Sequence, residues 1–177
     1  GCVDSFGVGE RLITAKSEPV FGAVYKISAV EEKPGEFVPR IKISENVEKI
    51  TNPGRKKVYR IIDEEGRAIA DMIAKADEVV DMSRPFLYVD PTKPWKNRYF
   101  ENCRAIELQK QIIRNGELVY DMPTLDEIAA YVKRQLSEEI WEEEQRFEYP
   151  HLHYLDMTPD YYEMKMQLLN DLSMKEV

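Results

Sequence analysis

Cysteine and histidine are scarce in this sequence of 177 residues, and its 25 lysines and arginines are outnumbered by 33 acidic residues. Its two cysteines, Cys2 and Cys103, form neither a disulfide framework nor a zinc-binding spacing, which fits a reducing cytoplasmic environment. The net charge is −8 at pH 7, which excludes nucleic acid as the default partner because a phosphate backbone requires a basic face. A composition of 43% hydrophobic and 33% charged residues predicts a globular protein with a real core.

Long apolar runs are also missing. No stretch approaches the length that spans a bilayer, and no basic start leads into an apolar core, so we expect neither membrane association nor a signal peptide. No Ser-His-Asp arrangement, internal repeat or low-complexity segment is present. The chain begins with Gly1 rather than methionine, which favours a C-terminal piece of something longer.

A glycine pair near the start is the first candidate binding site. Gly7 and Gly9 flank Val8, and without side chains at the glycines successive backbone N–H groups can converge on an anion. Ser5 adds a hydroxyl and Arg11 a cation, which together predict a phosphate cradle. By itself the Gly-x-Gly pattern is a weak signal that favours a plain turn between strands.

The middle of the chain has the alternation and turn residues of β-hairpins. Strands are predicted at 23–30 and 37–44 around Pro34-Gly35, at 58–62 and 67–74 around Asp63–Gly66, at 86–89, and at 106–113 and 117–120 around Asn115-Gly116. The segment 90–95 contains two prolines and is predicted to be a loop.

A cluster of positive charge stands out in this acidic chain. Arg55, Lys56, Lys57 and Arg60 lie at the start of a predicted strand. One interpretation is a solvated strand edge, where lysines discourage aggregation. The other is an anion-binding edge.

The last third of the chain is predicted to be helical. Thr124 and Glu127 have the spacing of a capping box, and Thr158 followed by Pro159 predicts the start of a final helix. Apolar residues recur at helical spacing after each start, so we expect each helix to bury one face. They are Leu125, Ile128, Ala129, Val132, Leu136, Ile140 and Trp141 in the first helix and Met164, Leu168 and Leu172 in the second.

His151 and His153 are the only histidines. A His-x-His pair on a strand points both rings one way, which suits a metal ion, but only Asp156 is close enough in sequence to be a third ligand. We therefore interpret both as surface or interface residues and predict no metal site.

Several stretches resemble, in the same order, the C-terminal part of the nicotinate phosphoribosyltransferase family. They are Asp4-Ser5-Phe6-Gly7-Val8-Gly9-Glu10-Arg11-Leu12-Ile13-Thr14, Gly22-Ala23-Val24-Tyr25-Lys26, Pro39-Arg40-Ile41-Lys42-Ile43-Ser44 and Thr51-Asn52-Pro53-Gly54-Arg55-Lys56-Lys57-Val58-Tyr59-Arg60. The resemblance is strongest from residue 4 to about residue 74, and segments 102–121 and 147–156 are similar to longer bacterial members.

The resemblance implies an α+β chain that is the C-terminal part of an irregular α/β-barrel phosphoribosyltransferase, with β-hairpins followed by a helical tail. It implies formation of nicotinate mononucleotide from nicotinate and 5-phosphoribosyl-1-pyrophosphate in NAD biosynthesis, with ATP hydrolysis and Mg²⁺. It also implies cytoplasmic location and a homodimer. The regions expected are 1–22, the end of the barrel with the phosphate loop, 23–100, the hairpins, and 101–177, the last hairpin and helical extension.

Some residue roles also follow from the resemblance. Ser5, Gly7, Val8 and Gly9 correspond to the loop that holds the ribose 5-phosphate, and Arg11, Lys42, Arg55 and Lys56 are candidate anion-binding residues. Related enzymes often have threonine in place of Glu10, so this carboxylate is expected to point away from the ligand.

The catalytic residues of the family lie upstream of this loop. Neither His151 nor His153 matches the position of the family's phosphorylated histidine. We therefore predict no catalytic residue here, and expect the chain to need the N-terminal half of the same enzyme. The alternatives are a non-catalytic phosphate-binding or interaction domain, or a fragment of an enzyme that uses nicotinamide or quinolinate.

Overall fold

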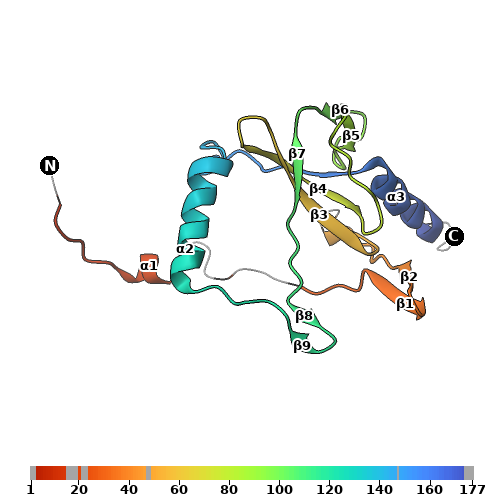
Figure 1. Ribbon diagram of the computed structural model, residues 1–177, viewed down its shortest axis with the longest axis horizontal. Helices are drawn as coiled ribbons and strands as arrows, with labels where there is room; N and C mark the ends of the chain where they lie inside the picture. Colours follow the sequence, from red (N-terminus) through yellow and green to blue (C-terminus); the bar gives the residue numbers. More distant parts are fainter. Residues whose placement is uncertain (1–2, 15–19, 21–23, 47–48, 147, 174–177) are drawn as a thin grey trace.

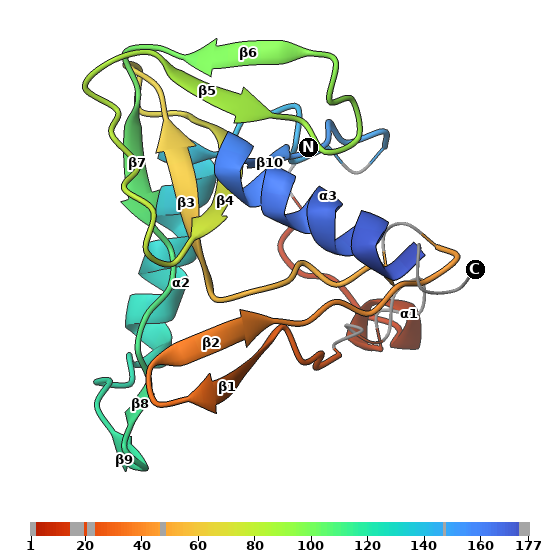
Figure 2. The same cartoon turned by 90° about the vertical axis from the view of Figure 1, so that its right-hand side faces the viewer.

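The computed structural model describes residues 3–14, 20, 24–46, 49–146 and 148–173. A mixed sheet stands at the centre, with helix α3 (Pro159–Ser173) on one side and helix α2 (Leu125–Arg134) on the other (Figures 1 and 2). Residues 3–14, which include the short helix α1 (Glu10–Ile13), extend away from this body (Figure 1). The predicted α+β class is confirmed.

The central sheet has six strands in the order β6-β5-β10-β4-β3-β7. Neighbouring strands are antiparallel except β10 and β4, which are parallel. The strands are β3 (Lys56–Ile62), β4 (Ala68–Lys75), β5 (Phe86–Val89), β6 (Asn97–Phe100), β7 (Arg104–Glu107) and β10 (Leu155–Met157). The predicted boundary between residues 100 and 101 falls inside this sheet.

The β3–β4 hairpin confirms the prediction from alternation and turn residues. Ile61 pairs with Ala70 in this hairpin. In the turn, the Arg67 backbone N–H donates to Asp63 Oδ1 at 2.7 Å. Gly66 has φ 87°, a conformation that side chains disfavour.

Successive side chains of β4 point to opposite sides of the sheet, and each side carries a hydrophobic cluster. One face carries the cluster Ile61, Ala70, Met72 and Phe100. The other carries Ile73, Met157 and Tyr161, which lie under α3. Burial of each large apolar side chain contributes roughly 1.5–3 kcal/mol, so these clusters hold the sheet and α3 together.

Helix α3 begins as predicted. The Tyr161 backbone N–H donates to Thr158 Oγ1 at 3.3 Å, and Pro159 occupies the first helical position. Tyr161 is fully buried and Met164 packs against its cluster, so the predicted apolar face contributes to the core.

Helix α2 forms where predicted, with its capping box complete. The Thr124 backbone N–H donates to Glu127 Oε2 at 2.7 Å and the Glu127 N–H to Thr124 Oγ1 at 3.3 Å. The prediction of a buried face is wrong, because no residue of α2 is buried and Leu125 is 84% exposed. Periodicity shows that a helix is amphipathic but not that a partner covers it. The chain continues as a π-helical turn, Gln135–Glu139.

Several predicted strands are shorter than expected. The first hairpin is β1 (Ala29–Lys33) and β2 (Glu36–Pro39), without regular structure at residues 24–28 and 40–44; residue 23 lies outside the described residues. The Asn115-Gly116 turn joins only β8 (Ile113–Arg114) and β9 (Glu117–Leu118). The sequence predicted one strand over 106–113, paired with 117–120. Residues 106 and 107 belong instead to β7, which pairs with β3. The tail is not wholly helical, because β10 returns to the sheet.

Candidate functional site

The glycine loop lies on the projecting N-terminal arm. Its backbone is accessible, since a Cβ atom at Gly7 or Gly9 would have no heavy atom within 4 Å. Ser5, Val8 and Arg11 are all exposed. The backbone amides are therefore open to a ligand, but the described residues supply only one side of such a site.

The candidate anion-binding residues do not converge on that loop. Lys42 is exposed and lines a shallow hollow together with Tyr25 and Arg40. Its carbonyl accepts a hydrogen bond from the Thr51 backbone N–H at 3.2 Å. The structure thus places Lys42 in an irregular segment, separate from Arg55 and Lys56 at the start of β3.

Lys56 turns back on the chain. Its Nζ donates to the Gly54 carbonyl at 3.2 Å, and burial lowers the pKa of its ammonium group. Lys56 therefore satisfies a turn carbonyl, and it does not line the cavity beside its neighbour Arg55.

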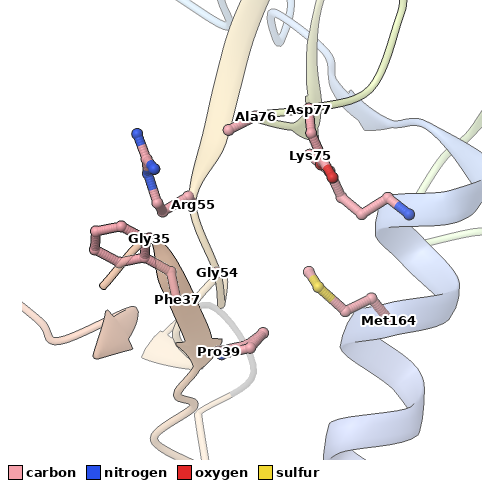
Figure 3. A pocket seen from close by; sticks show the side chains of 9 residues that line it. All are labelled: Gly35, Phe37, Pro39, Gly54, Arg55, Lys75, Ala76, Asp77 and Met164. Atoms are coloured by element: carbon pink, nitrogen blue, oxygen red, sulfur yellow. The ribbon is translucent and has the colours of Figure 1, made fainter. Parts of the chain in front are cut away.

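Arg55 borders a cavity of about 270 Å³ between the β1–β2 hairpin, the ends of β3 and β4, and α3 (Figure 3). Its guanidinium carbon lies 4.4 Å from the centre of the Phe37 ring, a cation–π contact. The cavity is lined by Gly35, Phe37, Pro39, Gly54, Arg55, Lys75, Ala76, Asp77 and Met164.

Side chains of both charges border this cavity. Lys75 Nζ lies 3.3 Å from Asp160 Oδ2, and Asp77 contributes a second carboxylate to the rim. Arg55 is held by an aromatic ring and not by an acid. Since Lys75 is paired with an acid, Arg55 is the candidate anion contact among the described residues that line the cavity.

A group of charged side chains that the sequence did not reveal lies on the sheet. Arg60 on β3 binds Asp71 on β4 through two hydrogen bonds, of 3.0 and 3.2 Å. His153 lies 3.3 Å from Asp71 and 3.1 Å from Glu144. His153 is therefore half-buried between carboxylates, while His151 is exposed. Residues 151–154 have no regular structure, since β10 begins only at Leu155, so the His-x-His pair does not lie on a strand.

Within the described ranges, no three side chains of His, Cys, Asp or Glu are grouped so that they could hold a metal ion. Cys103 is a free cysteine whose thiol pKa is raised by burial.

None of the described helices has the length and apolar character needed to cross a membrane.

The fold is that of part of a known phosphoribosyltransferase. It is similar to the crystal structure of human nicotinic acid phosphoribosyltransferase, with a TM-score of 0.60 and 23% sequence identity. The match covers 68% of this chain and 23% of the human chain. At this identity the likeness establishes the fold class.

Sequence comparison defines the family. Residues 55–165 match the model of the nicotinate phosphoribosyltransferase C-terminal domain, and the chain belongs to this family. It is 39% identical to nicotinate phosphoribosyltransferase of Bacillus subtilis (strain 168) over 96% of the chain, and 32% identical to that of Caenorhabditis elegans over 89%. The chain spans 34% and 26% of the length of these two relatives.

Proposed function

We propose that this chain is part of a nicotinate phosphoribosyltransferase, which forms nicotinate mononucleotide and pyrophosphate from nicotinate and 5-phosphoribosyl-1-pyrophosphate in NAD biosynthesis. The observation that carries the proposal is the family match over residues 55–165, together with 39% identity to the Bacillus subtilis relative. The chain corresponds to about a third of that relative, so the rest of the active site comes from an upstream part.

The chain's own contribution is the loop at Ser5 to Gly9. Backbone N–H groups there are open and carry no side chain at the two glycines, so they suit the ribose 5-phosphate of substrate or product. Transfer of the phosphoribosyl group develops charge that must be stabilised from several directions. A loop exposed on all sides cannot do this alone, which supports an inactive isolated chain.

The proposed enzyme uses Mg²⁺ with the pyrophosphate and hydrolyses ATP. We assign the binding of both to the upstream part, in keeping with a chain that corresponds to about a third of its relative. We further propose a cytoplasmic homodimer, in keeping with two cysteines that form no disulfide framework.

Reconstitution tests the proposal. The chain is assayed alone and co-expressed with the upstream part of the Bacillus subtilis relative, and formation of mononucleotide is measured with nicotinate, nicotinamide or quinolinate as the base. We expect nicotinate-dependent product only in the reconstituted protein. The matched control is the relative's own C-terminal segment supplied in the same way.

Two results would contradict the proposal. If the relative's own segment restores turnover and this chain does not, the chain is not a functional equivalent. Turnover by the chain alone would show that the upstream part is not required, and preference for another base would change the substrate.

A further inference from the structure

His153 lies between two carboxylates from distant parts of the chain. Its Nε2 is 3.3 Å from Asp71 Oδ1 on β4, and its Nδ1 is 3.1 Å from Glu144 Oε2. The side chains of His153, Asp71 and Glu144 are only 26%, 16% and 12% exposed. Water therefore screens these charges weakly.

This arrangement favours a charged imidazole. A neutral ring has one N–H, so one of its two nitrogens would direct a lone pair at a carboxylate. Only the imidazolium form presents a proton to both Asp71 and Glu144. The buried Nε2 makes an ion pair with Asp71 whose alignment falls short of a hydrogen bond, so its attraction depends on charge.

The surrounding charges favour that form. The close approach of Asp71 raises the pKa of His153, opposed by burial and supported by the charges of Asp71 and Glu144. Burial would raise the pKa of Asp71, but His153 and Arg60 together lower it. Arg60 is a second cation beside Asp71 and forms an ion pair with it. The hydrogen bond with Asp71 raises the pKa of Arg60, and the charges of Glu139 and Tyr131 raise it further.

The pKa of His153 is higher in the folded state than in the unfolded state. Its full contribution to stability is therefore present below the ordinary imidazole pKa, and this contribution is lost as the pH rises through the folded-state pKa. Asp71, with a lowered pKa, contributes above the ordinary carboxyl range and loses its contribution as the pH falls. His153 therefore attracts both carboxylates from mildly acidic pH up to its raised folded-state pKa.

Glu144 belongs to a segment that joins α2 to the sheet. We define this tether segment as residues 140–146. Trp141 Nε1 donates to the Ala68 carbonyl at 3.1 Å, and Arg67 donates to the Ile140 carbonyl at 3.4 Å. The guanidinium carbon of Arg67 lies 5.8 Å from the centre of the Trp141 ring. Because no residue of α2 is buried, the position of that helix depends on the tether segment.

We propose that His153 is a proton-dependent latch that holds the tether segment, and with it α2, against strand β4. The latch is closed while the imidazole is charged, and it opens as the pH rises and the ring becomes neutral. Glu144 then loses its cationic partner, while Arg60 still holds Asp71.

The chain offers an internal reporter and an internal control. A Trp95→Phe variant leaves Trp141 as the single tryptophan, so fluorescence reports the tether segment alone. The emission is followed from about pH 5 to about pH 9, across the range in which imidazoles titrate. NMR titration of the imidazole C–H protons gives the midpoints of His151 and His153 in the same samples.

We expect the Trp141 signal to change at the midpoint of His153, and this midpoint to lie above the ordinary imidazole pKa. In the same background, His153→Gln should lose the transition and His151→Gln should keep it. A transition that persists in His153→Gln, or its absence from the parent, overturns the proposal.

A second variant keeps the test decisive if His153→Gln does not fold. Glu144→Gln removes one carboxylate without changing the shape of its side chain. It should lower the midpoint of His153 and leave that of His151 in place. An unchanged His153 midpoint would show that Glu144 and His153 are not coupled, and would overturn the latch.

Discussion

Tyr161→Phe removes one oxygen atom from the contact between α3 and the turn before β3. The Tyr161 hydroxyl donates to the Pro53 carbonyl at 2.7 Å, across 108 residues of sequence. Both residues are buried, and burial raises the pKa of the phenol, so the hydroxyl remains a donor at neutral and mildly alkaline pH. The substitution keeps the ring and leaves the Pro53 carbonyl without this donor.

The expected loss of stability is about 1–2 kcal/mol, because a net hydrogen bond contributes roughly 0.5–1.5 kcal/mol and a buried acceptor without a partner costs more. For a chain of this size that corresponds to a fall in melting temperature of about 2–8 °C. Urea unfolding followed by circular dichroism measures the change, with the slope of the transition checked for constancy.

The matched control is Tyr162→Phe, the next residue of the same helix. Tyr162 packs against the same cluster, but within the described residues its hydroxyl forms no hydrogen bond. We expect this variant to change the free energy of unfolding by less than about 0.5 kcal/mol. Equal losses in the two variants would refute the reasoning, since the Pro53 contact would then contribute nothing of its own.

Two further predictions concern glycines. Gly54→Ala should destabilise the chain by more than Gly35→Ala in the same urea assay. Both glycines have φ near +80°, which costs about 1–2 kcal/mol for a residue with a side chain. Only at Gly54 would the new Cβ also meet Met164 Cε, at 3.3 Å, which adds about 1 kcal/mol. A similar loss in both variants would exclude a role for this contact. On the proposed function, Gly9→Val in the reconstituted enzyme should raise KM for 5-phosphoribosyl-1-pyrophosphate by about 10- to 100-fold, the effect of one charged hydrogen bond, whereas Val8→Ala should have little effect. Normal KM in Gly9→Val would exclude the loop from the phosphate site.

Local patterns predicted the parts of the fold that depend on neighbours in sequence. The β3–β4 hairpin follows from alternation around a Gly66 turn, and the start of α3 follows from Thr158 and Pro159. The capping box of α2 is equally local. In each case the determining contacts lie within a few residues of one another, so the sequence contains the whole of the required information.

Non-local pairing was the part that could not be predicted. Strand β10 has three residues and no alternation long enough to recognise, and it exists because it pairs with β4, more than 80 residues earlier. The same limit applies to His153, whose partners Asp71 and Glu144 are far apart in sequence. The exposed face of α2 illustrates the reverse case, in which a clear pattern exists but the described residues provide no cover for it.

In the candidate site too, the sequence pattern agrees with one feature of the structure and not with another. The accessible backbone at Gly7 and Gly9 agrees with the glycine pattern, since both positions are free of neighbouring atoms. The proposed anion cluster depended on proximity along the chain, but Lys56 bonds to a carbonyl and Arg55 stacks on Phe37. Adjacent residues on a strand point in opposite directions, so a run of basic residues does not form one surface.

Strand β10 also has a consequence for how this polypeptide is made. It is the strand that joins the β5–β6 pair to the β7–β3–β4 group, since it lies between β5 and β4. During synthesis on the ribosome, the edges of β4 and β5 that pair with β10 stay unpaired until Met157 has emerged. Exposed strand edges readily pair with other chains. A ribosome that stops before that point therefore releases a product prone to aggregation, even though most of the strands have already been translated.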